Sequence, residues 1–345
     1  MFARTPGAVC ITNPDASISL DLNLWASEKR DVWRSARSDA TWSPFRRAPF
    51  KRKGSTSHQP DRHRTQTKRV NIPSRSTIPR ARASRLTPRE PARTFRSGRN
   101  RFMPENKVAL IVGAGDATGG AIARRFAREG YSVCLTRRSA EKLDPLVQQI
   151  GQAGGKAHAF GSDARREDQV NDLFATIERD IGQIGVLIFN VGGNVRFPIR
   201  ETTTRVYTKV WEMCALAGFL NGRAAADVMV PRGAGTIIFT GATASIRGGA
   251  GYAAFAGGKH ALRALSQSMA RELGPEGIHV AHVVVDGAID TDFTRSRAPD
   301  RYESRKSTGG ILNPESIAEN YWMLHRQPRD AWTQELDLRP WSETW

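Results

Sequence analysis

The sequence predicts one doubly wound α/β domain with a parallel sheet over residues 105–345, preceded by a disordered basic segment over residues 1–104. From residue 105 onward, short β-branched runs alternate with longer amphipathic stretches. Strands that are apolar along their whole length are typical of a parallel sheet covered by helices on both faces. The charge is divided in the same way, since residues 1–104 hold 23 of the 52 Lys and Arg but only 7 of the 34 Asp and Glu. The basic character of the chain therefore belongs to its first segment.

The expected strands are short runs in which β-branched and other apolar residues follow one another. In chain order they are Val108–Val112, Ser132–Thr136, Val186–Phe189, Thr236–Thr240, His279–Val285 and Glu335–Leu338. Between them lie expected helices with apolar residues at helical spacing. These are Gly119–Glu129, Ala140–Ala153, Arg166–Ile181, Val206–Val230, Tyr252–Leu273 and Pro314–His325. Right-handed crossovers between parallel strands then wind the chain over both faces of one sheet.

Residues 1–104 are rich in Arg, Ser, Thr and Pro, and no apolar period is sustained between Thr41 and Arg101. Such a stretch buries too little apolar surface to offset its chain entropy, so we expect disorder. Three interpretations stay open: a stretch ahead of a native start at Met103, an organelle-targeting segment, or a nucleic-acid-binding arm. Four acids among the first 31 residues weaken the targeting interpretation. A nucleic-acid partner for residues 1–104 is not what we expect, although three tryptophans lie among the charges.

Several classes of protein are excluded by the residue types. No unbroken run of about 18 apolar residues occurs, so we expect no membrane-spanning helix and no membrane partner. Cys10, Cys134 and Cys214 are scattered and odd in number, which fits a reducing compartment and predicts a cytoplasmic protein. His279 and His282 lie three apart on an expected strand, so their side chains point to opposite faces and no metal site is expected.

A glycine-rich turn follows the first expected strand and leads directly into a helix. It reads Gly113-Ala-Gly115-Asp-Ala-Thr-Gly119-Gly120. Glycines at such a turn let the backbone approach a pyrophosphate, and the helix N-terminus then faces the negative charge. The turn therefore predicts phosphate binding by Gly113, Gly115, Ala117, Thr118 and Gly119.

From Lys107 onward the chain resembles the short-chain dehydrogenase/reductase family. The family turn Gly-x-x-x-Gly-x-Gly reads Gly113, Ala117 and Gly119, with alanine in place of its middle glycine. Four further landmarks follow in order: Asp163, Asn190, the helix from Tyr252 to Lys259, and the stretch from Asp286 to Thr291. The resemblance covers about seven-tenths of the chain. It implies a single Rossmann-like domain that binds a nicotinamide dinucleotide.

The second strand ends in Arg137 and Arg138, where Rossmann sites that prefer NAD usually carry an acid. Two guanidinium groups suit a 2′-phosphate, so NADP(H) is the expected cofactor, with NAD(H) as the alternative. The resemblance implies further contacts: Asp163 with the adenine, Asn190 and Gly192 with the ribose side, Lys259 with the nicotinamide ribose, and Ile289 and Thr291 with the nicotinamide. For Asn190 the alternative is a strand-end cap. Asp286 replaces the family's proline here, and its carboxylate either influences the nicotinamide or faces solvent.

The family's catalytic set of Asn, Ser, Tyr and Lys is incomplete. Lys259 is present, but the other three positions hold Ala215, Ala242 and Phe255. Tyr252 lies seven residues before Lys259, about 20° short of two full helical turns, so both lie on one helix face. This spacing is similar to that of the enoyl-acyl-carrier-protein reductase branch, and it makes Tyr252 the candidate that polarises or protonates the substrate oxygen.

Two hydroxyls lie close to the missing serine. Thr243 and Ser245 are the candidate auxiliary donors to the substrate oxygen, and the alternative is that they bond their own loop backbone. The polar, Arg-rich stretch Phe293–Gly310 is expected to be loop, at the place of the family's substrate lid. Four tryptophans follow near the end of the chain, and we expect them to belong to the core or to an interface. The alternative is that they shape a substrate pocket. They are Trp322, Trp332, Trp341 and Trp345.

These observations predict an NADP(H)-dependent oxidoreductase that reduces a carbonyl or enoyl group of a small molecule by hydride transfer. The alternative is a catalytically inactive dinucleotide-binding sensor or scaffold, which Ala215, Ala242 and Phe255 favour. By resemblance, a homodimer or homotetramer forms through the helices at about 206–230 and 252–273.

Overall fold

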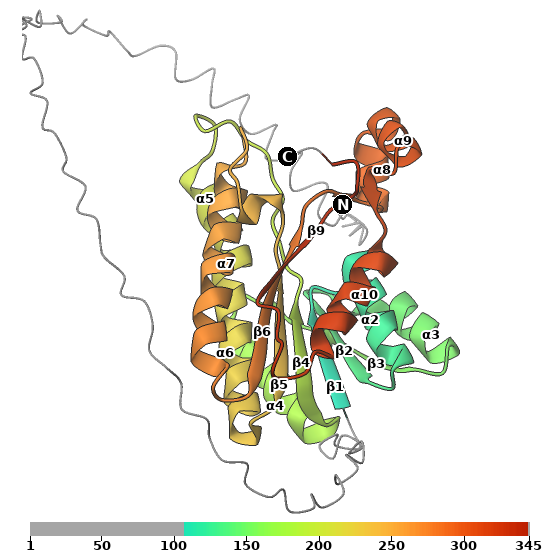
Figure 1. Ribbon diagram of the computed structural model, residues 1–345, viewed down its shortest axis with the longest axis vertical. Coiled ribbons are helices and arrows are strands. Elements are labelled where there is room, and N and C mark those ends of the chain that lie inside the picture. Colours follow the sequence, from blue (N-terminus) through green and yellow to red (C-terminus); the bar gives the residue numbers. More distant parts are fainter. Residues whose placement is uncertain (1–106, 344–345) are drawn as a thin grey trace, which may run out of the picture. The chain divides into compact units, whose positions relative to one another are not determined.

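The computed structural model describes residues 107–343 of the chain (Figure 1). All of them belong to one compact unit. The expected disorder of residues 1–104 and the expected position of Trp345 lie outside the described residues.

Seven parallel strands form the central sheet, in the order β3-β2-β1-β4-β5-β6-β9. Their bounds are β1 Lys107–Val112, β2 Ser132–Arg137, β3 Lys156–Gly161, β4 Gln183–Phe189, β5 Gly235–Thr240, β6 Ile278–Val285 and β9 Glu335–Leu338. The order reverses between β1 and β4, which confirms the expected doubly wound, Rossmann-like sheet. In such sheets, ligands bind beyond the carboxyl ends of the strands at this reversal.

Strand β3 was not expected from the sequence. Its residues, Lys-Ala-His-Ala-Phe-Gly, include no β-branched side chain, and none of them is buried, as expected of an edge strand. It is defined by its pairing with β2, which runs from Ser132 opposite Lys156 to Arg137 opposite Gly161. Pairing with a neighbour, and not intrinsic preference, therefore creates this strand.

Helices cover both faces of the sheet (Figure 1). On one face lie α2 (Thr118–Arg128), α3 (Asp144–Gln152) and α10 (Pro314–His325), whose apolar side chains share one buried cluster. On the other face lie α4 (Glu167–Asp180), α6 (Ala217–Met229) and α7 (Ala253–Leu273). Near-continuous burial of β1, β5 and β6 between these two layers explains why the strands read as unbroken apolar runs.

The expected helix Val206–Val230 consists of α5 (Thr204–Trp211), a π-helical turn over Glu212–Leu216, and α6. By length and composition, the stretch Thr204–Arg232 is the one described helix that could cross a membrane. More than half of its apolar window, 56%, is buried inside the protein, as in a core helix that covers a sheet. We expected no helix of this kind, because the sequence contains no unbroken apolar run of the required length.

The stretch Phe293–Gly310 is mostly helical, so the expectation of a loop is wrong. It contains most of α8 (Asp292–Arg297) and all of α9 (Pro299–Ser307), between the short paired strands β7 (Ala288–Ile289) and β8 (Ile311–Leu312). The buried Tyr302 anchors α9 by donating its hydroxyl hydrogen to Asp290 at 2.7 Å. This one tertiary anchor supplies what the polar sequence pattern does not show.

The C-terminal tryptophans have different surroundings. Trp322 contacts Phe126 edge-on, with 5.2 Å between ring centroids, and Trp332 stacks on His279 at 4.9 Å. Both lie in the packed body, as the core interpretation predicted. Trp341 is instead 86% exposed.

Candidate functional site

A glycine turn joins β1 to α2 at the carboxyl edge of the sheet. Gly113 has a φ of +87°, in the left-handed region that favours glycine. A Cβ atom at this residue would lie 2.9 Å from the carbonyl oxygen of Asn190, and one at Gly119 would lie 2.7 Å from the carbonyl oxygen of Gly113. Both glycines are therefore needed to bring the turn, the start of α2 and the end of β4 together.

Asn190 holds this turn from the neighbouring strand. Its Nδ2 donates to the carbonyl oxygen of Gly113 at 3.1 Å, and its backbone N–H donates to Val112 at 2.8 Å. The side chain therefore does more than cap the end of β4. It links the two strands at which the order of the sheet reverses.

The start of α2 has the features of an anion site. Its N-cap residue, Ala117, has no side-chain acceptor, and the first turn, beginning with the buried Thr118, contains no acid. The free N–H groups of such a helix end favour negative charge. At Gly115 there is open space where a Cβ would lie, with no heavy atom within 4 Å apart from its chain neighbours. The backbone of the turn therefore fits a phosphate group at close approach.

Arg137 closes β2 and the exposed Arg138 follows it. Neither guanidinium makes a hydrogen bond or an ion pair with another residue in the range 107–343. Asp163 instead accepts hydrogen bonds from Nε and Nη2 of Arg165 at 2.9 and 2.5 Å. These bonds are the main reason that the pKa of Asp163 is lowered, and the charge of Arg138 adds to the effect. The two arginines at the end of β2 can therefore take a further anion.

Lys259 places a buried ammonium at the same edge of the sheet. The residue is 3% exposed, and its Nζ donates to the carbonyl oxygens of Thr240 at 2.7 Å and Val191 at 3.1 Å. Burial lowers its pKa, which the nearby Cys214 partly opposes. A Cβ atom at Gly192 would lie 3.5 Å from this Nζ. The third N–H of the ammonium has no partner among the described residues and can donate to a ligand.

Tyr252 stands at the N-cap position of α7, just before the first helical residue. Its ring packs on an apolar group that we call the site cluster. The site cluster contains Val195, Val206, Val210, Met213, Cys214, Ala242, Ala244, Tyr252, Ala254, Phe255 and Ala256. The hydroxyl of Tyr252 makes no hydrogen bond to a described residue, so its proton is free for a ligand. Of the positions that depart from the family pattern, Ala242 and Phe255 belong to this cluster, and Ala215 is buried in the π-helical turn.

The hydroxyls of the two auxiliary candidates are directed into the protein. Thr243 Oγ1 donates to the carboxylate of Asp286. Ser245 is fully buried, and its Oγ accepts from the backbone N–H of Ala242 at 3.1 Å. Ser245 thus bonds its own loop backbone, which was the alternative interpretation, and it does not reach the surface of the cluster.

Asp286 does not face solvent, so that interpretation is wrong. The residue is buried, and Nη2 of Arg247 and Nη2 of Arg339 lie 3.4 and 3.6 Å from its Oδ2. Two guanidinium groups and the hydroxyl of Thr243 therefore surround this carboxylate. Asp286 directly follows β6, three residues before Ile289 of β7.

Ile289 closes β7, and Thr291 forms the N-cap of α8 by accepting from the N–H of Thr294 at 2.9 Å. Helix α8 therefore begins after β6 and the short strand β7. This arrangement puts both residues at the same sheet edge as Gly113 and Lys259.

Arg196 was missed by the sequence analysis. Its guanidinium carbon lies 5.9 Å from the centroid of the Tyr252 ring. No spacing in the sequence connects residue 196 with residue 252, so only the folded chain brings them together.

A cavity of about 1090 Å³ lies at the opposite, amino edge of the sheet, among Lys107, Tyr131, His279, His325 and Trp332. It is remote from the glycine turn and from Lys259. Among residues 107–343, no group of three His, Cys, Asp or Glu could hold a metal ion.

A parallel sheet with a glycine turn at its order reversal defines a dinucleotide-binding Rossmann-type protein. Residues 107–302 match the family model described as short chain dehydrogenase. The chain belongs to the short-chain dehydrogenase/reductase family of oxidoreductases.

Named relatives agree with this assignment. A curated gluconate 5-dehydrogenase from Gluconobacter oxydans is 30% identical over 230 residues, which cover 67% of this chain and 83% of the relative. A solved short-chain dehydrogenase from Rhodopseudomonas palustris is 47% identical, with a TM-score of 0.59 over 69% of this chain and 99% of its own. A metagenomic short-chain oxidoreductase solved in complex with NADP is 26% identical, with a TM-score of 0.59 over 68% of this chain and 97% of its own.

Proposed function

We propose that this chain is an NADP(H)-dependent oxidoreductase that reduces a carbonyl or enoyl group of a small molecule. The observation that carries the proposal is the Lys259 ammonium, fixed by the backbone carbonyls of Thr240 and Val191 beside Gly192. It keeps one N–H free at the edge where the glycine turn offers an open anion cradle. A buried ammonium is costly unless a ligand or the protein satisfies it, so this position favours a role in binding.

The residues that would hold the cofactor follow the sheet edge. The turn residues Gly113, Gly115, Ala117, Thr118 and Gly119 would carry the pyrophosphate, and Asn190 would keep the turn in place. Arg137 and Arg138 would bind the 2′-phosphate, and Asp163 would meet the adenine. Gly192, Ile289 and Thr291 would line the nicotinamide end. When bound, the nicotinamide supplies the hydride.

The remaining chemistry belongs to side chains of this chain. Lys259 would donate its free N–H to a ribose hydroxyl and so orient the reacting ring. Tyr252 would give its phenolic proton to the substrate oxygen as negative charge develops there. The site cluster would exclude water around the reacting carbon. In this structure Thr243 and Ser245 donate or accept within the protein, so Tyr252 carries the proton without a serine-type partner.

The first experiment is NADPH oxidation by the full chain with a small panel of ketones, quinones and enoyl thioesters. Turnover identifies an oxidoreductase, and the substrate that responds separates carbonyl from C=C reduction. Silence across the panel, with NADPH binding retained, would favour the inactive sensor or scaffold.

Tyr252→Phe tests the proton donor. We expect turnover to fall about 100-fold or more while the Kd for NADPH stays within a factor of about two, because only the phenolic oxygen is lost. Tyr207→Phe, which removes the same oxygen from an exposed residue of α5, is the matched control. Full activity of Tyr252→Phe would reject the role given to this tyrosine.

The choice of NADP(H) over NAD(H) rests on the two arginines of β2. In the double variant Arg137→Gln and Arg138→Gln we expect about a tenfold or larger rise in the Kd for NADPH, because charge-assisted bonds to a phosphate are lost. The Kd for NADH should stay constant. Arg205→Gln, at an exposed arginine of α5, is the control. Equal losses for both cofactors would show that the arginines do not select the phosphate.

We also propose a homodimer or homotetramer that forms through α5, α6 and α7. Three aromatic side chains on the first two helices are 41–44% exposed: Tyr207, Trp211 and Phe219. Exposed aromatics on neighbouring turns are typical of protein interfaces.

A further inference from the structure

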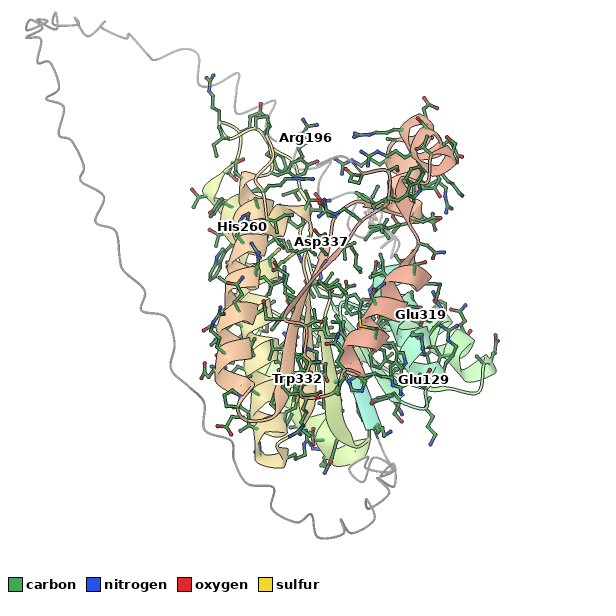
Figure 2. The ribbon with its side chains drawn as sticks, viewed as in Figure 1. Glu129, Arg196, His260, Glu319, Trp332 and Asp337 are labelled. Carbon is green, nitrogen blue, oxygen red and sulfur yellow. The ribbon has the colours of Figure 1, made fainter. Side chains whose placement is uncertain are left out.

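Arg196 lies at the entrance of the proposed site, in the loop that follows β4. Its neighbour Val195 packs into the site cluster, while Arg196 itself is exposed. Figure 2 shows it at the end of the molecule opposite Trp332, which lies at the amino edge of the sheet. The loop thus presents one apolar and one cationic side chain side by side.

The loop is held against the start of α7 by specific contacts. The backbone N–H of Phe197 donates to the carbonyl oxygen of Gly251 at 2.8 Å. Gly251 has a φ of +85°, and a Cβ atom there would lie 3.0 Å from Cγ and 3.3 Å from Nε of Arg196. Glycine at position 251 therefore leaves room for the side chain of Arg196, whose guanidinium carbon lies over the ring of Tyr252.

The charge of Arg196 has no partner within the described residues. It makes no hydrogen bond or ion pair there, whereas Arg247 lies 3.4 Å from Asp286 and Arg295 lies 2.9 Å from Asp290 at the same sheet edge. Stacking on an aromatic ring leaves the in-plane N–H donors of a guanidinium free. Those donors have the fork geometry that a carboxylate accepts with two oxygens.

Around Tyr252, the positions at which the family carries polar groups hold apolar residues. The family's polar positions are Ala242, Ala215 and Phe255, and Thr243 donates its proton to Asp286. A substrate bound beside Tyr252 would meet the phenol, the guanidinium of Arg196 and the half-buried apolar residues Val195 and Ala242.

We propose that Arg196 is the anion-binding residue of the substrate site, and that the substrate is an oxo acid with an apolar remainder. This inference rests on the proposed reductase function. Because the guanidinium carbon lies 5.9 Å from the centre of the Tyr252 ring, we expect the carboxylate to be close in the substrate to the reacting carbonyl. In the reaction, the hydride of NADPH adds to the carbonyl carbon and the phenolic proton of Tyr252 goes to the carbonyl oxygen. The products are a hydroxy acid and NADP+, and solvent returns the proton to the tyrosine.

The test compares benzoylformate with its methyl ester. Both contain the same phenyl ketone, but only the acid carries a negative charge at the carboxyl group. We expect the unmodified full chain to prefer the acid. Arg196→Gln should lower kcat/KM for the acid about tenfold or more, mainly through KM, and leave the ester within a factor of about two. Arg196→Lys, which keeps the charge but not the fork, should recover part of the loss. Arg200→Gln removes an exposed arginine from the same loop and should change neither substrate.

A binding measurement separates this inference from the reductase proposal. Benzoylformate is titrated into the NADPH complex of each variant, and the fluorescence of the bound cofactor is followed. Binding of the acid that depends on Arg196, without turnover, would support the anion site and count against the reductase. Turnover with the same acid-to-ester ratio in the unmodified chain and in Arg196→Gln would overturn the anion site alone. The absence of any preference for the acid, in turnover or in binding, would also overturn it.

Discussion

Two buried basic side chains near the proposed site are stabilised in different ways. Lys259 keeps two carbonyl acceptors for its ammonium, at 2.7 and 3.1 Å. His282 on β6 is fully buried, and its Nδ1 lies 3.2 Å from Oε2 of Glu335, while its Nε2 has no partner among the described residues. Burial is the main reason that the pKa of His282 is lowered to about 4. The imidazole is therefore neutral at physiological pH, and protonating it opposes folding.

His282 predicts a loss of stability in mild acid. The unfolded chain binds a proton at the ordinary pKa of 6.5, whereas the folded protein does so only near 4. The stability contribution is therefore complete above about pH 6.5 and falls as the pH approaches 4, by at most on the order of 3 kcal/mol. In His282→Leu, denaturant unfolding should show a smaller decrease in the free energy of unfolding between about pH 7 and pH 5.

The control for this effect is His158→Leu, at an exposed histidine of β3. Its pH dependence should match that of the unmodified chain. Parallel curves for His282→Leu and the unmodified chain would show that His282 is not the titrating group. Glu335 affects stability in a separate, more acidic pH range. Its pKa is lowered, mainly by the hydrogen bonds from Arg263.

At the scale of elements, two glycines of the turn between β1 and α2 have different expected roles. Gly119 is required by the packing of the turn, and Gly115 by the binding of the cofactor. Gly119→Ala would press a Cβ onto backbone 2.7 Å away, so we expect lost stability. Gly115→Ala meets open space, so the unfolding free energy should stay nearly constant. Its methyl group would nevertheless occupy the position proposed for the pyrophosphate. We expect the Kd for NADPH to rise about tenfold, measured by titration of cofactor fluorescence.

The two variants together make the outcome decisive. Unchanged NADPH binding by a folded Gly115→Ala protein would place the cofactor elsewhere. Stability lost in both variants would mean that the turn is packed more tightly than its open space at Gly115 suggests.

Local patterns predicted the elements that local residues determine. The apolar runs of β1, β5 and β6 and the glycine turn after β1 were read correctly because each depends on residues adjacent in the chain. Strand β3 and helix α9 were not, because β3 exists through its pairing with β2, and α9 is held by the bond from Tyr302 to Asp290. Sequence spacing does not report contacts of this kind.

The same distinction applies to the candidate site. The position of Lys259 follows from one helical pattern and is where the sequence predicted it. The partners of Thr243 and Tyr252 come from other elements: Asp286 lies 43 residues from Thr243, and Arg196 comes from the loop after β4. A hydroxyl one residue from the expected serine position is therefore engaged by a buried acid, and a loop arginine lies over the ring of the candidate proton donor.

At the scale of the described domain, the helices on its surface carry a feature that the fold alone does not explain. Tyr207 and Trp211 on α5 and Phe219 on α6 are 44%, 41% and 42% exposed, although α5 packs on α7. Helix α6 lies on the sheet face that α4 and α7 also cover, and α5 packs on α7, away from α2 and α10 (Figure 1). An assembly through α5 and α6 would remove these rings from water without covering the carboxyl edge that carries the proposed site.

Trp211→Glu tests this assembly. A carboxylate in the centre of an aromatic interface would be desolvated without a partner, so we expect the dimer or tetramer to dissociate at micromolar concentration. Sedimentation velocity of the full chain measures the change. Phe293→Glu introduces the same charge at a 61% exposed aromatic of α8 and should leave the assembly intact. If Trp211→Glu sediments like the unmodified oligomer, the interface lies on another surface. If the unmodified chain is itself a monomer, the exposed rings of α5 and α6 do not serve self-association.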